Sequence, residues 1–110
     1  MTQGIRAMAI ILLAAFIAAP AFAQTPGAIV YNTASPKCGM CHGADGLAAT
    51  PMAKNMKVLS FKDPAMVKAS DAQFFASTKN GKNRMPAYNG KLTDAQIMDV
   101  IAYIRTLQKE

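Results

Sequence analysis

Two thiols and an imidazole lie close together in the chain, at Cys38, Cys41 and His42. They are the two cysteines and the one histidine of the whole sequence. Cysteines three positions apart can form thioether bonds with the two vinyl groups of one haem, and the imidazole that follows can then bind the iron. The motif therefore predicts one haem c, covalently held by Cys38 and Cys41, with His42 as an axial ligand of the iron.

Three other kinds of site use a similar pair of cysteines: a disulfide, a thioredoxin-like redox pair and half of a zinc site. A redox pair is expected within an α/β pattern, which this sequence lacks. A zinc ion needs further cysteine or histidine ligands, and the chain has none to offer. In a chain with an export signal, described below, covalent haem is the interpretation that the motif favours.

The second axial ligand must be another residue type, because the chain has no second histidine. Met85 lies in residues 83–88, a predicted loop between two helices, far enough from His42 for the chain to wrap around a haem edge. Pro86 stiffens this loop, which helps to hold a weak thioether ligand in place. We predict Met85 as the ligand. Met56 is the next candidate and a five-coordinate iron the third, whereas Met98, on the last helix, is expected in the core.

The first 23 residues have the pattern of a secretory signal peptide. Arg6 precedes an unbroken apolar run over residues 7–19, and Pro20 and the sequence Ala-Phe-Ala follow it. The alternative is an uncleaved membrane anchor, but the run is shorter than the roughly 20 residues that span a bilayer. We expect cleavage after Ala23, export to a bacterial periplasm, and a single mature domain over residues 24–110.

The expected elements of that domain are all helical. Thr25 followed by Pro26 is a typical helix start, and capping-box patterns begin at Ser70 and at Thr93. We expect helices over residues 26–33, 71–80 and 94–107, a loop over residues 43–57 and one helical turn between residues 61 and 70. The last helix carries an apolar stripe at helical spacing, formed by Ile97, Val100, Ile101, Ile104 and Leu107. No alternating run predicts a strand, so the fold class is all-α.

The charge of the mature chain is strongly basic. Apart from Arg6, eleven of the twelve Lys and Arg residues remain, against six Asp and Glu. This balance favours acidic or anionic partners. The basic residues are scattered and not interleaved with aromatic residues, so the pattern does not favour nucleic-acid binding. A domain of this size buries little apolar surface, so it usually depends on a disulfide, a metal or a large cofactor for stability.

The mature sequence resembles the class I cytochrome c family over nearly its whole length. The matching residues are Gly27 and Tyr31, the segment 38–43, the segment 81–86 around Met85, and residues 92–97 and 100–104. The resemblance implies a small cytochrome c fold around one haem, in which the first and last helices cross at Gly27, Tyr31, Tyr103 and Ile104.

The resemblance also implies two supporting roles. Pro51 resembles a family proline whose backbone carbonyl accepts the second imidazole N–H of the ligand histidine. The chain has no tryptophan, so hydrogen bonds to a haem propionate must come from Tyr88, from Asn or Arg side chains or from backbone groups.

A haem iron with histidine and methionine ligands favours outer-sphere electron transfer over substrate activation. We therefore expect an electron carrier between redox proteins, and not an enzyme. The alternatives are a haem subunit of a larger oxidoreductase and a five-coordinate ligand-binding or sensor protein. In the family the exposed haem edge is ringed by the attachment segment and the methionine loop. The basic residues expected there, as a docking surface for acidic partners, are Lys37, Lys79, Lys82, Arg84 and Lys91.

Overall fold

The computed structural model describes residues 24–110, so the predicted signal peptide lies outside the described residues. Within this range the chain forms six helices and no sheet, with isolated bridges at Lys82–Met85 and Asn89–Leu92. The helices are α1 (Pro26–Thr33), α2 (Cys38–His42), α3 (Pro51–Met56), α4 (Pro64–Lys68), α5 (Asp71–Asn80) and α6 (Asp94–Leu107). The predicted all-α class is confirmed, as are the helices at α1, α5 and α6 and the single turn at α4. None of these helices is long and apolar enough to cross a membrane.

Local capping explains where the helices begin. The hydroxyl of Thr25 accepts a hydrogen bond from the N–H of Ala28, with Pro26 at the first helical position. Both predicted capping boxes are present, at Ser70 and at Thr93, and each satisfies two N–H groups that lack an intrahelical partner.

The expected loop over residues 43–57 is wrong in its second half, where α3 forms. Thr50 and Pro51 start this helix in the same way as Thr25 and Pro26 start α1, since the Thr50 hydroxyl accepts from the N–H of Ala53. Lys57 caps the end of this helix in the left-handed region, with φ of 55°. The start signal was readable in the sequence, but the surrounding Gly, Ala and Asn residues favoured a loop.

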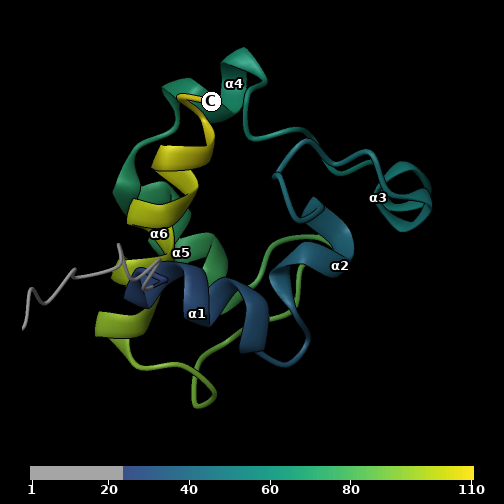
Figure 1. The fold of residues 1–110 in the computed structure, drawn as a ribbon. Helices are drawn as coiled ribbons and strands as arrows, with labels where there is room; N and C mark the ends of the chain where they lie inside the picture. Colours follow the sequence, from purple (N-terminus) through teal and green to yellow (C-terminus); the bar gives the residue numbers. More distant parts are fainter. Residues whose placement is uncertain (1–23) are drawn as a thin grey trace, which may run out of the picture.

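Helices α1 and α6 cross at close range, as the family resemblance implies (Figure 1). A Cβ atom on Gly27 would lie 2.1 Å from the carbonyl oxygen of Asp99 and 2.8 Å from Cβ of Tyr103. Beside this contact the rings of Tyr31 and Tyr103 meet edge to face, with centroids 5.3 Å apart. Glycine is therefore required where the two helix backbones approach each other.

The apolar stripe of α6 is buried as predicted, and it divides between two clusters. Val100, Ile104 and Leu107 pack with residues of α1 and with Phe61 and Tyr88, whereas Ile97 and Ile101 pack with Phe74 of α5. The expectation for Met98 is wrong, because its side chain is 47% exposed. It lies on α6 one position after Ile97, away from the buried stripe.

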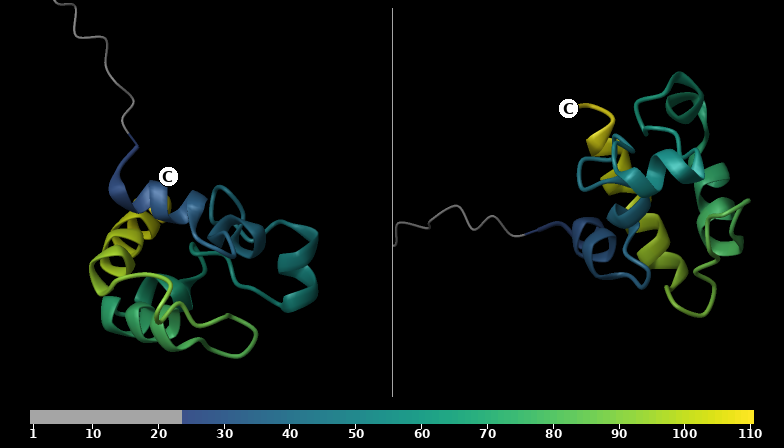
Figure 2. Two further views of the ribbon diagram at one scale, coloured as in Figure 1. Left: turned by 90° about the horizontal axis from the view of Figure 1, so that it is seen from below. Right: turned by 90° about the vertical axis from the view of Figure 1, so that its right-hand side faces the viewer.

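The remaining segments complete a ring. Figure 1 and the left view of Figure 2 show α2 and α3 on the side opposite α5 and α6, with the chain around α4 and the chain before α6 closing the two ends. Side chains from all parts of this ring line one cavity, which contains the predicted site.

Candidate functional site

Helix α2 carries the two cysteines and the histidine on five consecutive residues. Both sulfurs are free thiols on half-buried residues, so the pair is not a disulfide in this structure. Burial raises the pKa of Cys38 to about 11, so this sulfur is a protonated thiol at neutral pH. The hydroxyl of Tyr31 donates to the Gly43 carbonyl at 2.6 Å and ties the end of α2 to α1.

A cavity of about 860 Å³ opens beside α2 and has both cysteines and His42 in its wall. This volume lies in the upper part of the usual range for cofactor and ligand sites. No Asp or Glu is among the described residues that line it. The apolar part of the wall comes from residues distant in sequence, namely Tyr31, Phe61, Met66, Phe74, Val100 and Ile104.

The imidazole of His42 is suited to bind a metal as a neutral ligand. Burial lowers the pKa of His42 to about 4, which keeps the ring uncharged at neutral pH. Its Nδ1 atom is enclosed by protein without a hydrogen-bond partner among the described residues. Since His42 also lines the cavity, Nε2 is the nitrogen left to face it.

Met85 enters the wall of the same cavity from a tight turn between α5 and α6. The backbones of Lys82 and Met85 exchange two hydrogen bonds, of 2.9 and 3.2 Å, and Asn83 between them has φ of 53°. Gly81 is required at the base of this turn, because a Cβ there would lie 2.8 Å from the Met85 carbonyl oxygen. The turn therefore restricts the backbone of Met85, whose thioether lies in the cavity wall.

The donor set and the cavity fit a haem c. Two free thiols, one neutral imidazole and one thioether lie in the wall of a single, mainly apolar space. The spacing of the sulfurs and the imidazole on one helical turn matches what two thioether bonds and an axial ligand from one segment require.

Comparison with known proteins agrees with this chemistry. A family model described as cytochrome C oxidase, cbb3-type, subunit III, matches residues 22–104. A cytochrome c6 from a Synechococcus species is 34% identical over 102 residues, which cover 91% of this chain and 86% of the relative. The cytochrome c6 of Thermosynechococcus vestitus is 35% identical, covering 73% of this chain and 74% of the relative.

The chain belongs to the class I cytochrome c family. As a small monohaem cytochrome it carries one covalent haem c with iron, and it is an electron carrier, not an enzyme. A solved structure, the KustC0563 c-type cytochrome, shares the fold with a TM-score of 0.65 and 24% identity, covering 74% of this chain and 96% of that one.

Two further methionines lie in the haem cavity of this cytochrome, Met56 and Met66. Met56, the second candidate from the sequence, has its sulfur 3.9 Å from Sγ of Cys41, and Met52 has its sulfur 3.5 Å from the same atom. The Met56 sulfur therefore lies beside Cys41, one of the two predicted attachment points. Met66, from α4, was not a candidate in the sequence, and its backbone carbonyl accepts a hydrogen bond from Gln108 at 3.4 Å.

The two residues predicted to support the site have other contacts in the structure, and their roles toward the haem stay predictions. Pro51 begins α3, and its carbonyl is not a partner of His42, whose Nδ1 has no partner among residues 24–110. Tyr88 does line the cavity, but its hydroxyl donates to the carbonyl of Pro36 at 2.5 Å. Burial raises the pKa of Tyr88 to about 12, so the hydroxyl keeps its proton at neutral pH. This hydrogen bond joins the segment that carries Met85 to the segment that carries the two cysteines.

The basic residues around the cavity differ in part from those expected. Lys79 forms an ion pair with Asp94 at 3.0 Å, and Lys91 lines a separate groove with Val30 and Leu92. Lys57 and Lys68, which sequence reasoning missed, do line the cavity. We define the cationic rim as the basic residues in the cavity wall: Lys37, Lys57, Lys68, Lys82 and Arg84. No periodicity or motif in the sequence signalled the two additional lysines.

Proposed function

We propose that this cytochrome is an exported carrier of single electrons, in which Cys38 and Cys41 hold the haem and His42 and Met85 bind its iron. The observation that carries the proposal is that these four side chains line one cavity although Met85 is remote from the others in sequence. When bound, the haem supplies one-electron oxidation and reduction of its iron.

The protein residues restrict the chemistry to electron transfer. In this proposal the neutral His42 ring and the Met85 thioether would both hold the iron, which would leave no position for a substrate. The turn that carries Met85 and the α1–α6 packing limit rearrangement of the site between oxidation states. The apolar part of the wall would limit the access of water to the ligands, and a methionine ligand would raise the reduction potential.

Export and partner choice are also part of the proposal. The signal peptide over residues 1–23 would deliver the domain over residues 24–110 to a periplasm, where cysteines can be loaded with haem. The cationic rim surrounds the cavity without any acidic residue in its wall, which supports redox partners with acidic docking surfaces.

The Met85→Ala variant of the purified haem protein tests the ligand assignment. We expect loss of the methionine-to-iron charge-transfer band at the red edge of the visible spectrum, rapid binding of carbon monoxide by the reduced protein and a lower potential. Met98→Ala is the matched control, because Met98 is exposed on α6 and outside the cavity. An unchanged Met85→Ala spectrum excludes Met85 and directs the same test to Met56.

A second candidate function is that of a haem subunit in a larger oxidoreductase. The description of the matching family as an oxidase subunit favours it. Size-exclusion chromatography of a gentle extract, followed by haem staining, separates the two functions. A carrier elutes at the mass of the single chain, whereas a subunit elutes with a larger assembly.

A further inference from the structure

The ring of Phe61 lies flat against the imidazole of His42. The ring centroids are 4.6 Å apart and the planes differ by 19°. Phe61 is only 3% exposed and belongs to the segment before α4, which reaches the site from outside the attachment helix. Phe61 is therefore an aromatic neighbour of His42, the predicted iron ligand.

A metal-bound histidine is usually oriented by a hydrogen bond from its second ring nitrogen. Here Nδ1 of His42 has no such partner among the described residues, although it is enclosed. We propose that Phe61 is the positioning residue of His42: its stacked ring sets the plane of the imidazole and keeps water away from Nδ1. The inference rests on the proposed role of His42 as an iron ligand.

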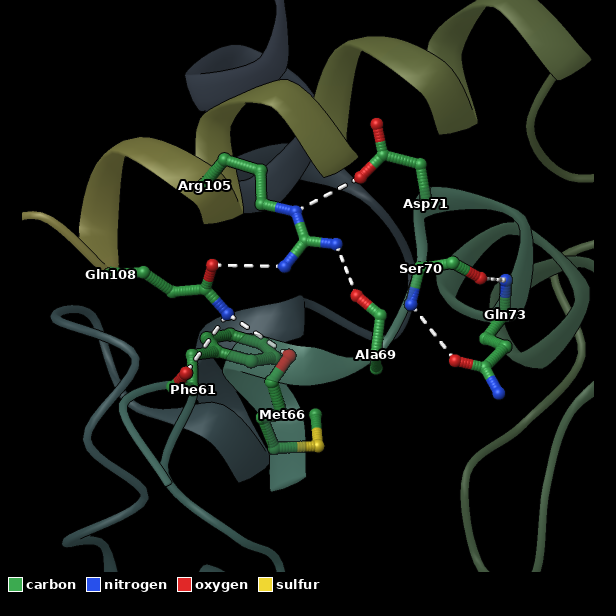
Figure 3. Close-up of polar contacts among 8 residues, drawn as sticks. All are labelled: Phe61, Met66, Ala69, Ser70, Asp71, Gln73, Arg105 and Gln108. Carbon is green, nitrogen blue, oxygen red and sulfur yellow. Dashed lines mark hydrogen bonds and ion pairs between the residues drawn. The ribbon is translucent and has the colours of Figure 1, made fainter. Parts of the chain in front are cut away.

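Phe61 is itself held by contacts along its backbone and side chain. Its N–H donates to the carbonyl of Gly46 at 2.9 Å. Its carbonyl accepts from Nε2 of Gln108 at 2.9 Å, as Figure 3 shows. A Cβ on Gly46 would lie 2.6 Å from Cδ2 of Phe61, so the glycine leaves the space that the ring occupies. Phe74 meets the Phe61 ring edge to face, with centroids 6.4 Å apart.

The last turn of α6 completes this support through Arg105 (Figure 3). Its Nη1 donates to Oε1 of Gln108 at 3.0 Å, and its Nε donates to Asp71 at 2.9 Å. The same guanidinium donates to the Ala69 carbonyl and lies 4.5 Å from the centroid of the Phe74 ring. Gln108 is thus oriented to hold Phe61, and Phe61 is oriented to hold His42.

The arrangement has a consequence for the reduction potential. A hydrogen bond from the second nitrogen makes a ligand imidazole more basic, which favours the oxidised metal. An imidazole that is stacked on phenylalanine and shielded from water is not made more basic in this way. The reduced state of the iron is then more stable relative to the oxidised state. Replacing Phe61 by a smaller residue admits water to Nδ1, and the potential then falls.

The test compares Phe61→Leu and Gln108→Met with a control, Phe75→Leu. Gln108→Met keeps the length and neutrality of the side chain but removes the donor to the Phe61 carbonyl. Phe75 is half-buried on α5 and does not line the cavity, so its replacement matches the change in size alone. The midpoint potential and the solvent exchange of the His42 Nδ1 proton, followed by NMR, are measured for each haem protein.

We expect the reduction equilibrium of Phe61→Leu to shift by up to tenfold toward the oxidised state, which is about 59 mV for one electron. Nδ1 exchange should accelerate, Gln108→Met should show smaller changes in the same directions, and Phe75→Leu should match the wild type. If Phe61→Leu has the midpoint potential of the wild type and the same rate of Nδ1 proton exchange, the inference is overturned. If that variant does not fold, wild-type values in Gln108→Met overturn it. Failure of the proposed function is seen separately, as a wild-type spectrum without low-spin histidine ligation, and it overturns both.

Discussion

The crossing of α1 and α6 at Gly27 makes a specific prediction about stability. In Gly27→Ala the new methyl group would lie 2.1 Å from the Asp99 carbonyl oxygen, whereas ordinary contact begins at 3.4 Å. That oxygen belongs to the backbone of α6, so it cannot move away by a change of rotamer. The two helices must separate by roughly 1 Å, which opens the packing around Tyr31 and Tyr103.

The expected cost follows from two opposing effects. Overpacking a close contact costs about 3 kcal/mol at the upper end of the usual range, and alanine regains about 1 kcal/mol through its higher helix propensity. The net loss of about 2 kcal/mol should lower the melting temperature of a domain this small by about 8–16 °C.

Thermal and denaturant unfolding of the haem protein, followed by circular dichroism, measures this loss. Gly39→Ala is the matched control, because a Cβ on Gly39 meets nothing closer than 3.6 Å in another helix. It should leave stability unchanged or slightly raised. A Gly27→Ala protein as stable as the wild type would refute the close crossing.

Three further predictions concern a buried hydroxyl, the cationic rim and the attachment site. Tyr31→Phe should cost about 1–3 kcal/mol, because it leaves a buried carbonyl without its donor. Burial raises the pKa of Tyr31 above its unfolded value near 10, so its contribution is complete below that pH and is lost as the pH rises toward the folded pKa. Unfolding curves of variant and wild type should converge above about pH 10, and constant separation contradicts this. Lys82→Glu should slow electron transfer to an acidic redox protein at low salt in stopped-flow measurements, whereas Lys91→Glu, outside the rim, should not; equal slowing contradicts the rim. Replacing both cysteines of the motif by alanine should leave little folded protein, and a cooperative melt of that haem-free variant would count against coupled folding and attachment.

Much of the fold follows from local sequence signals. Thr25 with Pro26, Ser70 and Thr93 mark three helix starts that the structure confirms, because capping depends on side chains within three residues of the helix end. The apolar stripe of α6 is likewise local, since helical spacing places its members on one face. The start of α3 was encoded in the same way at Thr50, and it was missed because composition outweighed the capping signal.

The chemistry of the site was also readable before the structure, because the spacing of Cys38, Cys41 and His42 is itself local. What required the tertiary structure was the set of contacts between distant segments that no motif or resemblance predicted. The stack of Phe61 on His42 and the ion pair that removes Lys79 from the rim join residues with no pattern between them. Pairings of this kind depend on how helices pack, and packing is set by contacts across the whole chain. The sequence by itself therefore determined the cofactor and the three longest helices, because their signals are local, whereas the tertiary structure decided which side chains support the imidazole and which charges surround the cavity.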